Sequence, residues 1–461
     1  MRNDNQLLKY CFMRISIAFV SILICLNTYS QVERLSDNTF FTDSSFSVLC
    51  NGEFIWEYEN GNIGEKVNYI NGKVNGVYEL YNENGSLNYQ ANYKNGDLNG
   101  LSIWYYENGD IHFQSNYKHD LLNGESIYYD THGNVELKEY YLNNQLNGIS
   151  TAYHQNGKVK EIANYKRGRL NGLRTFYNSN GRKVKELNYL KHKLDGKAYT
   201  FFDNGKIQNE SFYQKDELIG LSIWYDENGN KVSETSYLSG KKNGIFTSFH
   251  INGNIELSGE YINNKRNGEW KKFNSNGSLI EMNNYVNNQL EYSSYNYYEN
   301  GSVKTKWNYT HGDLQGPTIL YYPSGKIYEK IGYADNIKHD TTYRYFENGK
   351  LAAIETYVHG LKHGEWKCFQ KREKEYIKIN YYNNSIQGPF FTYYKNGRLK
   401  SKGYFLNDLL NGELFLYHKN KKVAYSTEFK SGEMVSEESF YNKKGKVYSP
   451  IDIECEAVSE K

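Results

Sequence analysis

Short stretches of β-forming residues alternate with turn signals along this chain. Residues 101–106 and 110–117 are both rich in such residues, and a Glu-Asn-Gly turn signal stands between them at 107–109. A three-residue loop that ends in glycine suits a type I turn followed by a left-handed residue. The pattern therefore predicts a β-hairpin in which Tyr105 lies opposite Ile111 on one face of the sheet.

This hairpin pattern returns every 24 residues along most of the chain. With few exceptions, the glycine of the first turn recurs from Gly61 to Gly445, and a second glycine series recurs from Gly52 to Gly412. An aromatic residue holds every position of a ladder that begins at Tyr81. A fixed period of this kind is the signature of a repeat architecture.

The second turn of each unit, such as residues 118–124, returns the chain to the next hairpin, so successive hairpins are predicted to join into one meander. About sixteen units, each adding two strands, would extend about 150 Å before twist is counted. The predicted fold is all-β: an elongated single antiparallel sheet of tandem 24-residue β-hairpin repeats. The predicted organisation is a signal peptide at 1–30, an N-terminal cap or linker at 31–51, the repeat array at 52–447 and a C-terminal tail at 448–461.

The repeat resembles the MORN repeat in its variant form. The residues that carry the resemblance in one unit are Gly100, the aromatic pair Tyr105-Tyr106, Gly109, Ile111, Tyr117 and Gly124. Bacterial proteins built of this variant are often grouped as YwqK-family antitoxins, so the resemblance implies an immunity role as one function. MORN-type arrays are also linked to membranes, which implies contact with lipid head groups as another.

Composition agrees with strands and glycine turns rather than long helices, because the 461 residues include 47 Tyr and 40 Gly but only 4 Pro. Basic residues precede an apolar run at 15–26, which indicates a secretory signal peptide with cleavage before Gln31. The expected location is the periplasm, the outer envelope or the extracellular space. A retained anchor, or a lipoprotein attached through Cys25, stays open as an alternative.

The charge balance argues against general binding to polyanions, and the cysteine content argues against a disulfide-stabilised fold. Removal of residues 1–30 leaves equal numbers of basic and acidic residues, so the chain offers no general electrostatic attraction to nucleic acid or anionic lipid. Three cysteines remain after that removal, Cys50, Cys368 and Cys455. Such an odd and scattered set does not form a disulfide framework.

The sequence carries no catalytic motif, and we predict that the protein is not an enzyme and uses no cofactor or metal. His311 and His359 share one register position with Asp335, and His339 shares another with His363. Residues in register on successive hairpins are about 10 Å apart, too far for joint coordination of one ion at about 2 Å. Solvated turn residues are the preferred interpretation, with His359 and His363 of one turn as the alternative ligand pair.

The array departs from its glycine pattern at five positions. Glu373 and Lys421 replace the glycine of the first turn, and Tyr292, Asp340 and Ser436 replace the second glycine. A left-handed conformation costs a residue other than glycine about 1 kcal/mol. Altered turn geometry is therefore expected at these positions.

One aromatic cluster is the candidate binding site. Tyr298, Tyr322 and Phe346 belong to consecutive units and are expected to line up on the face opposite the aromatic ladder. A local aromatic stretch on a polar face is a reasonable partner-binding patch. The alternative is that sheet curvature buries the three rings against neighbouring side chains.

These observations together favour a non-enzymatic exported repeat scaffold that mediates protein–protein interaction at the cell envelope. The expected partner is a protein, with a toxin among the candidates and nucleic acid excluded. The alternatives are an antitoxin or immunity protein that neutralises a toxin, and a binder of lipid head groups or envelope polysaccharide.

Overall fold

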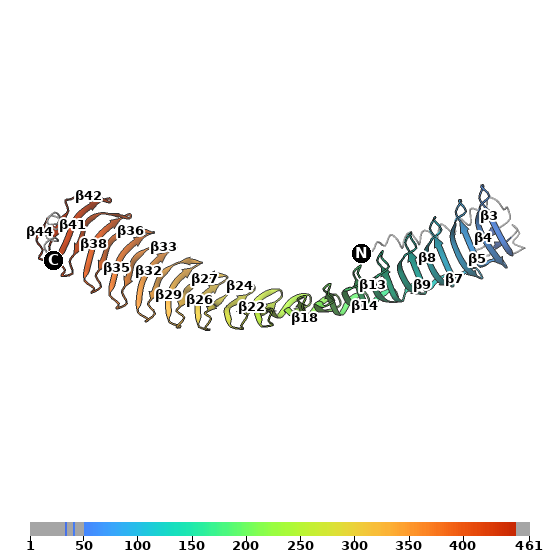
Figure 1. The fold of residues 1–461 in the computed structure, drawn as a ribbon, viewed down its shortest axis with the longest axis horizontal. Helices are drawn as coiled ribbons and strands as arrows, with labels where there is room; N and C mark the ends of the chain where they lie inside the picture. Colours follow the sequence, from blue (N-terminus) through green and yellow to red (C-terminus); the bar gives the residue numbers. More distant parts are fainter. Residues whose placement is uncertain (1–32, 35–39, 42–49, 449–461) are drawn as a thin grey trace, which may run out of the picture. The chain divides into compact units, whose positions relative to one another are not determined.

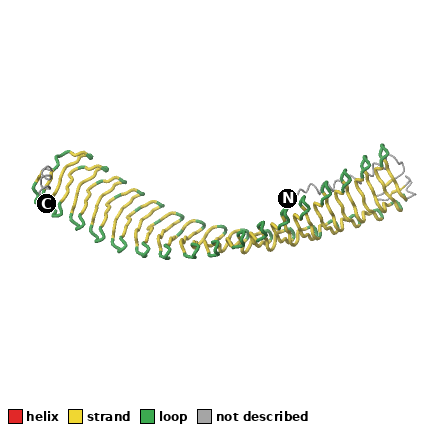
Figure 2. The backbone as a smooth tube through the Cα atoms, viewed as in Figure 1, coloured by secondary structure: helices red, strands yellow, loops and turns green. Residues whose placement is uncertain are grey.

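The computed structural model describes residues 33–34, 40–41 and 50–448. The predicted signal peptide, Cys455 and all but the first residue of the predicted tail lie outside the described residues. Figure 2 shows the described part as strands and turns, and this part contains no helix of the length and apolarity that crossing a membrane requires. Two compact units divide the chain: unit 1 is residues 1–219 with 227–229, and unit 2 is residues 220–226 with 230–461.

Unit 1 contains a two-stranded sheet and a larger antiparallel sheet. Its strands are β1 (Glu33–Arg34), β2 (Phe40–Phe41), β3 (Gly52–Glu57), β4 (Ile63–Ile70), β5 (Lys73–Tyr81), β6 (Leu87–Lys94), β7 (Asp97–Tyr105), β8 (Ile111–Lys118), β9 (Leu121–Tyr129), β10 (Val135–Leu142), β11 (Gln145–Leu146), β12 (Gly148–Tyr153), β13 (Val159–Lys166), β14 (Arg169–Tyr177), β15 (Lys183–Leu190), β16 (Lys193–Phe201) and β17 (Ile207–Gln214).

Unit 2 continues the same pattern, and β18 begins at the last residues of unit 1. The strands are β18 (Glu217–Tyr225), β19 (Lys231–Leu238), β20 (Lys241–Phe249), β21 (Ile255–Ile262), β22 (Lys265–Phe273), β23 (Leu279–Val286), β24 (Gln289–Leu290), β25 (Tyr292–Tyr297), β26 (Val303–Thr310), β27 (Asp313–Leu314), β28 (Gly316–Tyr321), β29 (Ile327–Ala334), β30 (Ile337–Lys338), β31 (Asp340–Tyr345), β32 (Leu351–Val358), β33 (Leu361–Lys362), β34 (Gly364–Phe369), β35 (Glu375–Tyr382), β36 (Ser385–Ile386), β37 (Gly388–Tyr393), β38 (Leu399–Leu406), β39 (Leu409–Leu410), β40 (Gly412–Tyr417), β41 (Val423–Lys430), β42 (Glu433–Met434), β43 (Ser439–Tyr441) and β44 (Val447–Tyr448).

Within each unit, strands pair antiparallel with their neighbours along the chain, as Figure 1 shows. In the hairpin of β7 and β8, Tyr105 pairs with Ile111 after a bulge. The Gly109 N–H donates to the Tyr106 carbonyl at 2.9 Å, and Gly109 has a φ of +88°. This is the predicted type I turn with a left-handed glycine. The prediction of an all-β antiparallel sheet built of 24-residue hairpins is confirmed.

In several repeats the second glycine also leaves room for a neighbouring side chain, as at Gly100, whereas at others, such as Gly76 and Gly220, a Cβ would meet nothing within 4 Å. Gly100 has a φ of +117°, and a Cβ at this position would lie 3.2 Å from the Cβ of Asn92 on the neighbouring strand. That close approach lets the Asn92 side-chain amide donate to the Leu101 carbonyl at 2.8 Å. The glycine is therefore needed both for its conformation and for the room it leaves.

The strand pairing defines two faces, which we call the inner and the outer face. The inner face carries Ser102, Ser115 and Ser126, which pair in succession across β7, β8 and β9; the outer face carries Tyr105 and Ile111. Nearly all buried strand residues lie on the inner face, the exceptions being Ile127, Thr175 and Thr247. The inner face therefore forms the packed side of the sheet, and the aromatic ladder of the sequence lies on the outer face.

Side chains also connect each hairpin to the next. At the first turn, the Tyr58 hydroxyl donates to the Tyr81 carbonyl at 2.9 Å, and the Asn60 amide donates to the Glu83 carbonyl at 2.8 Å. The second turn has a corresponding bond, in which the Leu98 N–H donates to the Asp120 carboxylate at 2.8 Å. Equivalent bonds recur along both units. Because they join neighbouring repeats only, they are the contacts that a stacked repeat array requires.

The expectation of altered turns at the glycine replacements is wrong at four of the five positions. Glu373 and Lys421 adopt φ values of 64° and 73°, and their N–H groups make the same turn hydrogen bond as the glycines. Tyr292 and Asp340 both have a φ of 63°. Ser436 alone leaves the left-handed region. The hydrogen bonds of the repeat thus outweigh a cost of about 1 kcal/mol per left-handed residue.

Candidate binding surfaces

The structure places the predicted aromatic patch at the first turn of each hairpin, directly after the strand. The Tyr298 and Tyr322 hydroxyls donate to the carbonyls of Tyr321 and Tyr345 at 2.7 and 2.9 Å. Both rings are half-buried, as is that of Phe346. Partner binding at these three residues stays a prediction, but two of them already connect consecutive hairpins.

The same register position makes this connection in other repeats, and sequence reasoning missed it. Tyr106 and Tyr394 donate through their hydroxyls to the carbonyls of Tyr129 and Tyr417. His154 makes the equivalent bond through Nε2. The available signal was a long side chain with a polar tip that returns at the repeat period, always just after the ladder aromatic.

A second candidate surface is a line of exposed apolar residues on the outer face beside the second turn. These residues lie either at the end of the second hairpin strand or directly after the second glycine. We call them the apolar margin: Ile70, Val77, Leu101, Leu142, Ile149, Leu173 and Leu190 in unit 1, and Leu221, Leu238, Ile245, Ile262, Val286, Tyr382 and Leu406 in unit 2. Their exposed fractions range from 36 to 64%. Each unit therefore exposes a row of apolar side chains to solvent along one side of its outer face.

In unit 1 the margin borders a groove at the second turns of three consecutive hairpins. The groove has a volume of about 670 Å³, and its lining includes Asn75, Asn92, Asn99, Asn116 and Asn123. The Asn92 and Asn116 amides donate to backbone carbonyls at 2.8 and 3.1 Å, which leaves their side-chain oxygens available as acceptors. The groove thus combines amide groups with the aliphatic side chains of the neighbouring margin.

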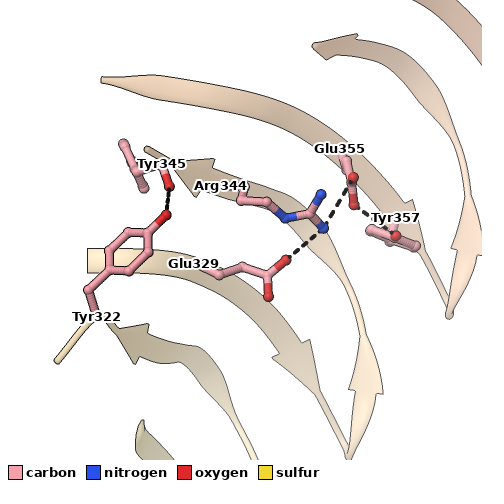
Figure 3. Close-up of polar contacts among 6 residues, drawn as sticks. All are labelled: Tyr322, Glu329, Arg344, Tyr345, Glu355 and Tyr357. Atoms are coloured by element: carbon pink, nitrogen blue, oxygen red, sulfur yellow. Dashed lines mark hydrogen bonds and ion pairs between the residues drawn. The ribbon is translucent and has the colours of Figure 1, made fainter. Parts of the chain in front are cut away.

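A half-buried ionic cluster lies on the inner face of unit 2 (Figure 3). The Arg344 guanidinium contacts the carboxylates of Glu329 at 3.0 Å and Glu355 at 3.5 Å, and the Tyr357 hydroxyl donates to Glu355 at 3.2 Å. Burial and the Glu355 charge raise the pKa of Tyr357 to about 12. Burial opposes the charge of Arg344, but the two carboxylates raise its pKa overall. The guanidinium makes both ion pairs through Nη2, and its buried Nε has no hydrogen-bond partner. Because the opposite charges pair within the sheet, we interpret this cluster as packing.

The structure brings His339 and His359 together, a different pair from His359 and His363, which the sequence offered as alternative metal ligands. His339 and His359, from successive hairpins, have ring centroids 5.3 Å apart, and the His359 N–H donates to His339 Nδ1. His363 instead packs against Tyr382. The described residues contain no group of three His, Cys, Asp or Glu side chains placed to hold a metal. Among the described residues, neither Cys50 nor Cys368 forms a disulfide.

Comparison with solved structures gives only slight overall likeness. The crystal structure of TcdB2-TccC3-Cdc42 is 11% identical over 84% of this chain and 26% of that chain, with a TM-score of 0.15. The Photorhabdus luminescens Tc holotoxin pore is 12% identical over 84% of this chain and 27% of that chain, also with a TM-score of 0.15. This chain spans about a quarter of the length of those chains. No curated protein matches.

A protein-family model supplies the clearer result. The model described as the MORN repeat variant matches ten segments: residues 51–71, 74–95, 98–119, 146–167, 194–215, 218–238, 266–287, 314–335, 341–359 and 386–407. MORN repeats suggest a scaffold or binding role, and the repeat is a non-catalytic module. The matches coincide with hairpins of both units, and the repeats in these ten segments are similar to the MORN repeat variant.

Proposed function

We propose that the protein is an exported, non-enzymatic repeat scaffold that binds a protein partner at the cell envelope. Export rests on the basic and apolar pattern of residues 1–30. Binding without catalysis rests on the repeat type and on the similar residues that successive units keep at equivalent positions, because a catalytic site requires distinct residues held in one concave place.

The observation that carries the proposal is the apolar margin. Single exposed apolar residues are ordinary on protein surfaces, but rows that recur in register over many repeats indicate an interaction surface. The fold does not require apolar residues there, because other repeats have Lys118 or Lys166 at the strand-end position and Glu125 or Lys197 after the second glycine. Retention of exposed Leu and Ile at so many units is explained by a partner that covers them.

The test is affinity capture from envelope extract and culture medium with the native chain and with a Leu142→Lys, Ile149→Glu variant. Both new residues already stand at the same register in the preceding repeat, as Lys118 and Glu125, and the net charge is unchanged. The unfolding free energy should change by less than about 0.5 kcal/mol, as for ordinary surface substitutions. Capture of a stoichiometric protein partner should fall strongly.

The matched control is Lys118→Gln with Glu125→Gln, which alters the same registers without touching an apolar residue. Capture should survive in this control. If the margin variant retains its partner, or if glycan or lipid is captured without any protein, the scaffold proposal is wrong. A captured partner that is toxic when expressed alone would turn the proposal toward an immunity role.

A further inference from the structure

One row on the outer face of unit 2 is unusually basic. The row takes one residue from each long strand between β22 and β41, at the middle of the sheet, and the strands that carry it are yellow to orange-red in Figure 1. Six of its members are lysines and none is acidic: Lys271, Lys306, Lys330, Lys367, Lys378 and Lys402. We call this the lysine row.

Backbone register shows that the members of the row are direct neighbours. Lys306 pairs with Tyr295 on one side and Ile319 on the other. Lys330 pairs in turn with Ile319 and Tyr343. Cross-strand partners of this kind have Cβ atoms about 5 Å apart. The row is therefore a continuous strip in which lysines stand among aromatic and aliphatic side chains.

Unit 1 provides an internal comparison, because the same register positions form a row there too. Its charged members are Lys66 and Lys138 against Glu79, Glu186 and Glu210. The hairpin repeat therefore tolerates acidic residues at this place in the sheet. Glu234 on β19 of unit 2 also stands at this register, between Ile223 and Thr247. The absence of acid is therefore a property of the strands from β22 to β41 and not a requirement of the fold.

Within the part of the chain that the structure describes, half of the lysines in the row form no ion pair. Lys367 and Lys378 share the Glu365 carboxylate, and Lys271 contacts Glu269 at 2.7 Å. The ion pairs found among the described residues include none with Lys306, Lys330 or Lys402. Lys306 and Lys402 instead lie over aromatic rings of the row, with Lys402 Nζ 4.6 Å from the centroid of Phe415.

Acidic residues border the strip on the side of the second turn. They stand two residues from a row member along the same strands: Glu269, Glu365, Glu413 and Glu428. A broad anionic surface such as a lipid bilayer would contact these carboxylates as well as the lysines. Membrane-binding patches, in contrast, cluster Lys and Arg over an area. The narrow basic strip suits a single extended chain.

We propose that the lysine row binds an extended acidic segment of a protein partner, lying across the strands of unit 2. Lys306 and Lys330 are two strands apart, about 10 Å. A polyproline II chain rises about 3.1 Å per residue and has three residues per turn, so every third side chain lies on one side at about 9 Å. Lys378 and Lys402 are likewise two strands apart, with Phe391 between them. Acidic residues three positions apart would thus meet Lys306 and Lys330, or Lys378 and Lys402, while the residues between them contact Ile319 or Phe391.

The experiment measures binding of a fluorescent peptide to the full chain by anisotropy. The peptide has Glu at every third position and Pro at the others, and its comparison peptide has the same composition with all Glu residues contiguous. The spaced peptide should bind more tightly, and its affinity should fall as salt rises. Lys306→Gln, Lys330→Gln and Lys402→Gln combined should weaken its binding about tenfold, the effect of three partly exposed ion pairs.

The matched control removes three other lysines of unit 2, which lie in the first turns: Lys326→Gln, Lys395→Gln and Lys419→Gln. This variant loses the same charge and should bind the spaced peptide as the native chain does. Equal weakening by both variants, or equal binding of both peptides, would show a general charge effect and overturn the proposal. Tighter binding to anionic vesicles or to single-stranded nucleic acid than to the spaced peptide would overturn it as well.

The inference rests on the proposed protein-binding function but can fail separately from it. The peptide titration needs no natural partner and tests unit 2, whereas the Leu142→Lys, Ile149→Glu capture tests a margin in unit 1. If the margin variant loses its partner but both peptides bind equally well, only the lysine-row proposal is wrong. If the spaced peptide binds more tightly but the margin variant still captures its partner, only the apolar-margin proposal is wrong.

Discussion

At the scale of single residues, one register position serves the connection between hairpins. Tyr298 and Tyr322 directly follow strands that end in a residue of the aromatic ladder, and each reaches the backbone of the next hairpin through its hydroxyl. Burial is the main cause of the raised pKa of Tyr322, with smaller contributions from Tyr328 and Glu347. Phe346 has a similar ring at this position but cannot donate a hydrogen bond. The three residues of the predicted patch therefore differ in the structural task they can perform.

This difference gives a direct prediction. Tyr322→Phe keeps the ring and removes the donor to the Tyr345 carbonyl, so it should lower the free energy of unfolding by about 0.5 to 1.5 kcal/mol. Urea unfolding followed by circular dichroism measures it. Tyr328→Phe is the matched control, because Tyr328 contacts the same ring but its hydroxyl makes no such connection. An unchanged unfolding curve for Tyr322→Phe, with loss of partner capture for Tyr322→Ser, would instead support the patch as a binding site.

At the scale of the hairpin, inner-face neighbours are matched in size. Trp270 is almost completely buried, and the neighbouring inner-face residue on β21 is Gly259, where a Cβ would lie 2.2 Å from the indole. Phe390 faces Gly403 in the same way, with a corresponding distance of 2.6 Å. The inner face is packed by its own side chains, so a large residue fills the space that a neighbouring glycine leaves.

Gly259→Ala should therefore lower the free energy of unfolding by about 1 to 3 kcal/mol through overpacking against Trp270. The double variant Gly259→Ala, Trp270→Ser removes the clash, and Ser is the residue that Ser222 and Ser294 supply at this register. The test is a double-mutant cycle by chemical unfolding, in which the double variant should be more stable than the sum of the two single changes predicts. Simple additivity would contradict the packing argument.

Sequence reasoning reached the hairpin but not the contacts between hairpins. The pairing of Tyr105 with Ile111 follows from turn chemistry within one repeat, so the residues themselves specify it. The bond from Tyr322 to the Tyr345 carbonyl depends on the stagger of adjacent hairpins, which the repeat period does not contain. The repeat period already places Lys306 and Lys330 in register, but only strand pairing joins the lysines of the two hairpin strands, such as Lys367 and Lys378, into one row. Glu373 shows the converse case, in which neighbouring hydrogen bonds override a local preference.

At the scale of the whole molecule, stability should be close to a sum over repeats and their nearest-neighbour contacts. The bonds from Tyr58, Asn60 and Leu98 to the following hairpin connect residues 22 to 23 positions apart and reach no further along the chain. No repeat then depends on a distant one for its core. We therefore expect folding to depend on the 24-residue period being kept, rather than on the total length of the chain.

Two deletions in unit 1 test this directly. Removal of residues 127–150 takes out one full period and joins Ser126 to Thr151, so each side chain keeps its face, and the variant should unfold nearly as the native chain does. Removal of residues 127–149 differs by one residue and joins Ser126 to Ser150, which turns the rest of the strand over and moves Tyr153 to the inner face. With several cross-strand pairs lost at about 0.2 to 1 kcal/mol each, the second variant should be about 1 to 3 kcal/mol less stable than the first. Thermal unfolding and limited proteolysis of the two variants measure the difference. Equal stability would mean that the sheet absorbs a one-residue slip as a bulge, and that face assignment is not what the 24-residue period preserves.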